Sequence, residues 1–162
     1  MDLDFKDPDT RQELHHHFAA TCFNQTWGFI DQATRTPEET EDMLAACYAS
    51  LYHWKQRADC APRNLSVAFW QLSRVHALAG HAALATSWGE RCLAVSTDAE
   101  LPAFYLGYAH EALARAGLER SDTDAASAHL EAATEALTKV TDAESREMLK
   151  ADLEALGGQL GG

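Results

Sequence analysis

The chain has 162 residues and a formal net charge of −12, with 46% hydrophobic and 23% charged residues. This hydrophobic share is too high for a disordered chain, and the length suits one domain with a sizeable core. A surface of this negative sign repels phosphate backbones, which argues against nucleic acid as a partner.

The composition predicts an all-α fold, because alanine is abundant, β-branched residues are sparse, and no run alternates apolar and polar residues for long. No apolar run approaches the length of about 20 residues that crosses a bilayer. The acidic start MDLDFKDPD lacks the basic and apolar regions of a secretory signal. Cys22, Cys47, Cys60 and Cys92 form no close pair in the sequence. We therefore expect a soluble cytoplasmic protein whose cysteines are structural thiols, with a disulfide or a metal site as the alternatives.

Two helices are expected in the first third of the chain. Asp7 and Pro8 are a typical N-cap and first helical position, so the first helix should span residues 8–32. One face of this helix holds Leu14, Phe18, Cys22, Gln25 and Phe29, and a second, nearly opposite face holds Ala20, Phe23, Trp27 and Ile30. Thr36 and Glu39 form a capping box around Pro37, so the second helix should span residues 37–57. One face of that helix consists of small residues and ends in a histidine: Ala46, Ala49, Ser50 and His53.

The next two helices are separated by Gly80, which can adopt the left-handed conformation that ends a helix. They should span residues 62–79 and 81–96, because Pro62 disfavours helical geometry before it. The first of these helices has two apolar or aromatic stripes at helical spacing. Its core stripe is Leu65, Phe69, Leu72, His76 and Ala79, and its opposite stripe is Val67, Trp70, Arg74 and Ala77.

A fifth helix should follow Pro102 and end at Gly117. Its core stripe is Pro102, Leu106, Ala109, His110 and Leu113, and its opposite stripe is Phe104, Tyr108, Glu111 and Arg115. A sixth helix should follow the polar residues 121–124, and Thr141 to Glu144 is interpreted as a capping box that begins the seventh. The seventh helix has one narrow apolar side, which predicts a terminal lid on a single domain of residues 1–157. The glycine-rich tail at residues 158–162 is expected to be flexible.

Seven helices of this kind resemble a tetratricopeptide (TPR-like) repeat array. The residues that carry the resemblance are Phe69, Leu72, His76, Gly80 and Ala85 in one unit, and Leu106, Ala109, Leu113 and Gly117 in the next. The step from Gly80 to Gly117 is longer than the usual repeat of about 34 residues. The strings at residues 50–54, 70–74 and 108–114 are also similar to a small uncharacterised bacterial family of TPR-like proteins, which implies no activity.

The resemblance implies that the first helix of each pair lines a concave groove. That groove would contain Trp70, Arg74, Phe104, Tyr108 and Glu111, and the opposite stripes indicate the same residues independently. We therefore expect a non-enzymatic module that binds a peptide or a partner protein in the groove. Aromatic rings would supply buried area, and Arg74 would meet a carboxylate or a main-chain carbonyl.

Two other functions stay open. In the first, His53 is an acid or base in an enclosed small-molecule site or enzyme, and Arg74 and Glu111 fix the substrate. In the second, a homodimer buries the same face. Purely structural roles are open as well: His53 as a core histidine bonded to a backbone carbonyl, an ion pair between Arg74 and Glu111, and inter-helix packing for Trp70 and Tyr108.

No recognised enzyme or metal motif is found. His15, His16 and His17 point about 100° apart on a helix and cannot converge on one ion. None of the eight histidines has another four residues away, and the HExxH, GxSxG and glycine-rich phosphate motifs are absent. The sequence therefore predicts no catalytic residue, no metal and no cofactor.

Overall fold

The computed structural model describes residues 4–162, so the first three residues of the acidic start lie outside the described residues. Within that part, the chain forms seven α-helices and no strand, as the composition predicts. The helices are α1 (Pro8–Ile30), α2 (Pro37–Gln56), α3 (Pro62–Leu78), α4 (Ala82–Asp98), α5 (Ala103–Glu119), α6 (Thr123–Thr138) and α7 (Ala143–Leu160).

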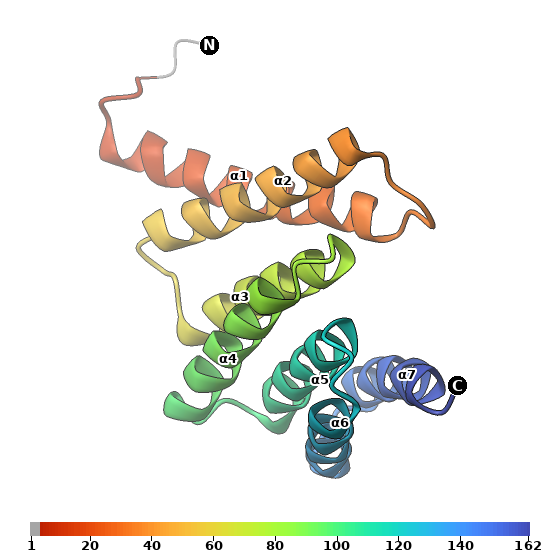
Figure 1. Cartoon of the computed structure of the whole chain (residues 1–162). Coiled ribbons are helices and arrows are strands. Elements are labelled where there is room, and N and C mark those ends of the chain that lie inside the picture. Colours follow the sequence, from red (N-terminus) through yellow and green to blue (C-terminus); the bar gives the residue numbers. More distant parts are fainter. Residues whose placement is uncertain (1–3) are drawn as a thin grey trace.

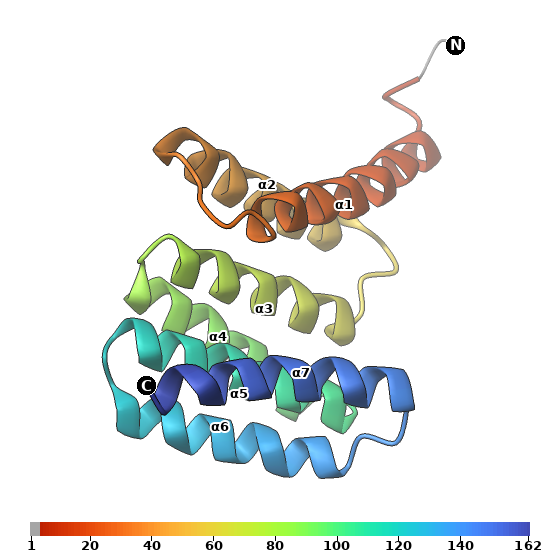
Figure 2. The same ribbon diagram turned by 90° about the vertical axis from the view of Figure 1, so that its right-hand side faces the viewer.

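The helices form an array of antiparallel hairpins, α1–α2, α3–α4 and α5–α6, and α7 packs on α5 and α6 (Figure 1). Successive hairpins are rotated relative to one another in this view. Helices α3 and α5 lie side by side and run in the same direction, as their matched stripes predict (Figure 2). Helix α7 crosses in front of α5 in Figure 2, so the odd-numbered helices follow one another along one side of the array.

The predicted helix starts at Pro8, Pro37 and Pro62 are confirmed, whereas the second of the two predicted capping boxes is not formed. The Asp7 side chain accepts a hydrogen bond from the Thr10 amide at 2.7 Å, and the capping box of Thr36 and Glu39 is formed at 2.8 and 3.1 Å. The capping box expected at Thr141 is wrong, because Asp142 is the N-cap of α7 and accepts from the Ser145 amide at 2.8 Å. An aspartate in this position satisfies the amide without a reciprocal glutamate.

Three of the helices are followed by a residue whose backbone adopts the left-handed conformation. Gly80 has φ 74°, as predicted, and the His81 amide donates to the His76 carbonyl at 2.8 Å. Glu100 and Ser121 adopt the same conformation, with φ 49° and 56°. The prediction that Gly117 ends its helix is therefore wrong: α5 continues to Glu119, and the chain turns at Ser121 instead.

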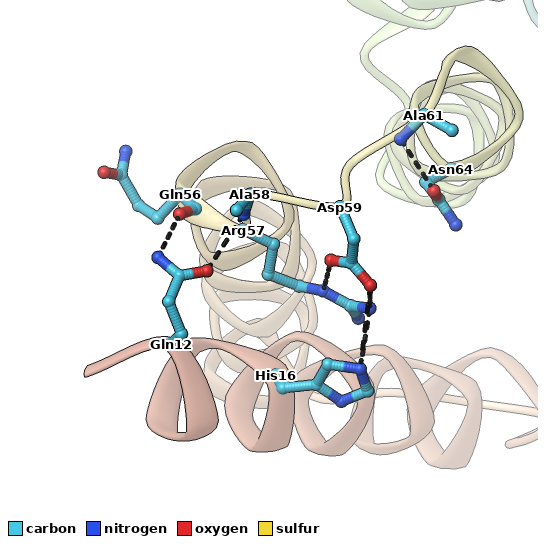
Figure 3. A network of polar contacts seen from close by, with 8 residues as sticks. All are labelled: Gln12, His16, Gln56, Arg57, Ala58, Asp59, Ala61 and Asn64. Atoms are coloured by element: carbon cyan, nitrogen blue, oxygen red, sulfur yellow. Dashed lines mark hydrogen bonds and ion pairs between the residues drawn. The ribbon is translucent and has the colours of Figure 1, made fainter. Parts of the chain in front are cut away.

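A polar network fixes the end of α2 against α1 (Figure 3). The side-chain Nε2 of Gln12 donates to the backbone carbonyl of Gln56 at 3.1 Å, and its Oε1 accepts from the backbone N–H of Ala58 at 2.9 Å. Arg57 donates to the Asp59 carboxylate and, at 2.7 Å, to His16 Nε2. These bonds satisfy polar groups at the point where the chain leaves α2 for α3.

The core consists of three apolar clusters, and α5 contributes to each of them: the smallest joins Ala77, Ala85 and Ala116. The largest cluster joins α1 to α5 through buried residues such as Met43, Leu72 and Val75. The second joins α5, α6 and α7 and includes Leu149 and Leu153. Helix α7 thus covers the C-terminal end of the array with its narrow apolar side, and it continues through both glycines after Leu156 to residue 160, beyond the boundary expected at 157.

The four cysteines are free thiols. Cys47 and Cys92 are buried, and burial raises the pKa of the Cys92 thiol to about 11. A thiol in such surroundings is unreactive, which fits the structural role expected for these residues. Across residues 4–162, no helix has the length and apolar character needed to span a membrane.

Each of the three hairpins contains a histidine pair between its two helices or at their junction. The Nδ1 atoms of the paired rings lie 2.8, 3.2 and 3.1 Å apart in His15–His53, His76–His81 and His110–His129. At this separation one nitrogen must accept the proton of the other, so both rings of a pair cannot be protonated in this geometry.

The surroundings of the paired histidines favour neutral rings. Burial, followed by the charge of the facing histidine, lowers the pKa of His53, His76 and His110. Burial also lowers the pKa of His129, although the Glu90 carboxylate acts in the opposite direction. The unfolded chain therefore binds protons more readily at these positions than the folded chain does.

Substitution of Gly117 by alanine should test the close contact between α5 and α6. A Cβ at this position would lie 2.9 Å from the Ala126 amide nitrogen and 3.1 Å from its Cα. The backbone must therefore shift, and Gly117→Ala should lower the free energy of unfolding by about 1–3 kcal/mol in urea denaturation. Gly28→Ala is the matched control, because a Cβ there meets nothing within 4 Å and should add up to about 1 kcal/mol through helix propensity. Equal effects of the two substitutions would contradict the packing described.

The histidine pairs predict that acid destabilises the fold. Because the folded-state pKa values of His53, His76, His110 and His129 are lowered, stability should be complete above the unfolded-state pKa of about 6.5 and should fall as the pH drops through and below it. Urea denaturation at a series of pH values should show this slope, and His110→Gln should reduce it. His17→Gln is the control, because the closest polar partner of His17 is Thr21 rather than another histidine. An identical slope in all three proteins would refute the prediction.

Candidate functional site

A cavity of about 250 Å³ opens on the side of the array that the odd-numbered helices form. It is lined by Phe23 and Trp27 of α1, Ser66, Val67 and Trp70 of α3, Phe104, Tyr105 and Tyr108 of α5, and Met148 and Asp152 of α7. All six aromatic rings are partly exposed, so the cavity is accessible from solvent. Four helices from different parts of the sequence thus contribute to one apolar site.

Trp70 is at the centre of a continuous series of aromatic contacts. Its ring centroid lies 5.6 Å from that of Trp27 on α1 and 5.5 Å from that of Tyr108 on α5. The Tyr108 ring in turn contacts Phe104 at 5.0 Å in an edge-to-face arrangement. The rings therefore support one another across three helices, which fixes the cavity wall before any ligand arrives.

A buried carboxylate holds the Trp70 ring in place. Glu111 has no solvent exposure, and its Oε2 accepts a hydrogen bond from Trp70 Nε1 at 2.8 Å. Its other oxygen, Oε1, pairs with Arg115 one turn further along α5. Both carboxylate oxygens are satisfied, as a buried charge requires, and Glu111 lies beneath the cavity rather than on its surface.

Arg74 has no such partner. It is largely buried one turn after Trp70, and its Nε makes no hydrogen bond with any described residue. Burial, reinforced by the charge of Arg115, lowers the pKa of Arg74, while the charges of Glu111 and Asp152 act in the opposite direction. An ion pair between Arg74 and Glu111, one of the structural roles left open by the sequence, is not formed. Glu111 pairs instead with Arg115, four residues further along the same helix.

Tyr108 links the cavity wall to the last helix. Its hydroxyl donates a hydrogen bond to Asp152 Oδ2 at 2.7 Å. Burial and the hydrogen bond to this carboxylate raise the pKa of the Tyr108 phenol, so the hydroxyl stays protonated and keeps donating. This hydrogen bond therefore fixes the position of the Asp152 carboxylate relative to the Tyr108 ring at the rim of the cavity.

The structure brings most of the expected site residues together but excludes His53. Trp70, Phe104 and Tyr108 line one cavity, with Glu111 beneath it and Arg74 close enough to interact with its charges. His53 lies between α1 and α2 instead, where it contacts His15, Phe18 and Tyr52. The enclosed site of His53, Arg74 and Glu111 is therefore not formed, because the end of α2 that carries His53 packs on α1. The hydrogen-bond partner of His53 is His15 rather than a backbone carbonyl.

Several cavity residues were not assigned to the groove from the sequence. Phe23 and Trp27 were recognised only as a second face of the first helix, and their spacing of one helical turn was the available signal. Tyr105 directly follows Phe104 on α5 and lies outside the stripe from which the groove is expected. Met148 and Asp152 belong to α7, and nothing in the periodicity of α7 shows that this helix reaches the same site.

Comparison with family models, with curated proteins and with solved structures finds no match for this chain. In the part of the chain that the structure describes, no three His, Cys, Asp or Glu side chains are grouped so that they could hold a metal ion. The chemistry that the site offers is that of aromatic rings, one carboxylate at the rim and a guanidinium nearby.

Two substitutions should distinguish Glu111, which has buried hydrogen-bond partners, from Arg74, whose Nε has none among the described residues. Glu111→Ala leaves Arg115 without its buried partner and should lower the free energy of unfolding by about 3–5 kcal/mol. Arg74→Met keeps the volume but removes a charge that has no partner, so it should change stability by less than about 1 kcal/mol or increase it. Urea denaturation measures the free energy of unfolding of both variants. Comparable losses in the two variants would show that Arg74 has a structural partner.

Proposed function

We propose that this protein is a non-enzymatic TPR-like interaction module, which binds an extended segment of a peptide or partner protein along its odd-numbered helices. The observation that supports this function best is the single aromatic cavity to which α1, α3, α5 and α7 all contribute. A concave site made by the first helix of each hairpin is the place where the TPR-like resemblance puts a ligand. The rings supply the buried apolar area on which peptide recognition depends.

The size of the cavity supports a peptide side chain as its occupant. Pockets that enclose whole drug-sized molecules have volumes of about 300–1,000 Å³. The cavity here is smaller, at about 250 Å³, and its aromatic lining is partly exposed. A single side chain fills such a space while the rest of the segment lies along the helices outside it.

Arg74 gives the proposed segment a polar anchor. Its guanidinium lies one turn from Trp70 and has no carboxylate partner among residues 4–162. A largely buried cation without a partner is costly, and a main-chain carbonyl or a carboxylate of the ligand would offset that cost. The site therefore combines an apolar anchor at Trp70 with a polar anchor at Arg74, which fixes the direction of the bound segment.

Selection from a random peptide library displayed on phage tests this function even though the natural partner is unidentified. Selected peptides should bind the intact protein, and Trp70→Ala should weaken them by about 2 kcal/mol, or about 30-fold, because a central aromatic anchor is lost. Isothermal titration calorimetry measures the affinities, and circular dichroism checks that the helical content is unchanged.

Trp88→Ala is the matched control for this experiment. Trp88 lies on α4, stacks on Phe69 at 5.4 Å, and does not line the cavity. Its substitution removes the same side chain and should leave peptide affinity within a factor of about two. A selection that yields no binding peptide, or peptides that bind Trp70→Ala as tightly as the intact protein, would refute the proposed function.

A further inference from the structure

The aromatic residues of the cavity form walls rather than a flat stack. Trp70 and Tyr108 meet at an interplanar angle of 79°, Phe104 and Tyr108 at 70°, and Phe104 and Tyr105 at 89°. Rings at such angles present their faces in several directions around the same space. The face of an aromatic ring carries negative potential, and several faces around one space attract a cation more strongly than they attract a neutral group.

Asp152 adds a negative charge at the rim of this space. Of the described residues that line the cavity, Asp152 alone carries a formal charge. Its Oδ2 accepts the Tyr108 hydroxyl at 2.7 Å, and no described residue donates a hydrogen bond to Oδ1. A neutral occupant would desolvate this carboxylate without giving it a counter-charge, whereas a cationic occupant would supply one.

Three arginines lie near the cavity, and none of them lines it. Arg115 is neutralised by Glu111, and Arg35 donates to two backbone carbonyls at 2.9 Å. Arg74 does not line the cavity, and in the proposed function it meets a carbonyl or carboxylate of the bound segment. The chain as a whole carries a net charge of −12, which draws cationic ligands toward it over long distances.

Building on the proposed function, we propose that the cavity binds an alkylammonium group, the side chain of a lysine or of an N-methylated lysine in the bound segment. The rings of Trp27, Trp70, Phe104 and Tyr108 surround the methylene or methyl groups, and Asp152 faces the positive charge. The partner is therefore a basic segment rather than an acidic or purely apolar one.

Three small molecules of the same shape and different charge test this inference directly. They are choline, its neutral analogue 3,3-dimethylbutan-1-ol, in which carbon replaces the ammonium nitrogen, and the carboxylate 3,3-dimethylbutanoate, which carries a negative charge. Each is titrated into the full chain while the indole N–H signals of Trp27 and Trp70 are followed by nuclear magnetic resonance. The Trp88 signal serves as an internal control, because this ring lies outside the cavity. Choline should bind about tenfold more tightly than the alcohol, as expected for a desolvated cation on aromatic faces, and more tightly still than the acid.

Asp152→Asn provides the second readout, because asparagine retains an oxygen that can accept the Tyr108 hydroxyl. The substitution should weaken choline by about five- to tenfold and leave the neutral alcohol unchanged. Glu154→Gln is the matched control: it removes one negative charge from an exposed position on the same helix, where Glu154 lies 3.8 Å from Lys150, and should not affect either ligand.

The inference is overturned if the alcohol or the acid binds as tightly as choline, if none of the three shifts the Trp27 or Trp70 signals, or if Asp152→Asn and Glu154→Gln have the same effect. These outcomes are distinct from failure of the proposed function. Peptides from the phage selection that depend on Trp70 but contain no lysine would support groove binding and refute the alkylammonium site. If choline binds but the selection yields no peptide, the alkylammonium site is supported and the proposed peptide-binding function is refuted.

Discussion

The buried carboxylate of Glu111 constrains the centre of this molecule. A charge with no solvent exposure must be compensated inside the protein, and among residues 4–162 two donors do so: Arg115 on the same helix and the indole of Trp70 on α3. The hydrogen bond to the indole joins two helices that belong to different hairpins. It also sets the plane of the Trp70 ring, against which Trp27 and Tyr108 then pack. The cavity wall is thus a consequence of how one charge is neutralised.

Small residues on α5 make this arrangement possible. Helix α5 contacts α3, α4, α6 and α7, so its side chains must be short wherever a neighbouring helix crosses it. Gly117 lies against the backbone of Ala126, and Ala116 packs with Ala77 and Ala85. The aromatic residues of α5 line the cavity, whereas Leu113 packs against Gly89 of α4 and His110 bonds to His129 of α6. The short residues of α5 thus allow close packing against its neighbours, and its aromatic residues form part of the cavity wall.

The fold could be predicted from the sequence to a large extent, because helix starts and apolar periodicity are local properties. The capping box at Thr36 and the left-handed Gly80 were both recognisable. Ser121 is not recognisable, since a serine in the left-handed conformation carries no sequence signal of its own, and the sequence predicts the helix end at Gly117 instead. Only part of the site can be predicted from the sequence, because periodicity too is a local property. Stripes identify residues on the same face of a helix, but they do not show that α7 brings Asp152 to α3 and α5.

The sharing of the cavity among the odd-numbered helices affects how the array unfolds. In a linear array each hairpin is stabilised mainly by its immediate neighbours, so the two ends can open separately. A ligand in the cavity touches α1 near one end of the chain and α7 at the other, and it stabilises only the state in which both are docked. Occupancy would therefore couple the opening of the two ends. Amide hydrogen exchange in α1 and α7 would slow together when the ligand binds, although these helices are the first and last in the sequence.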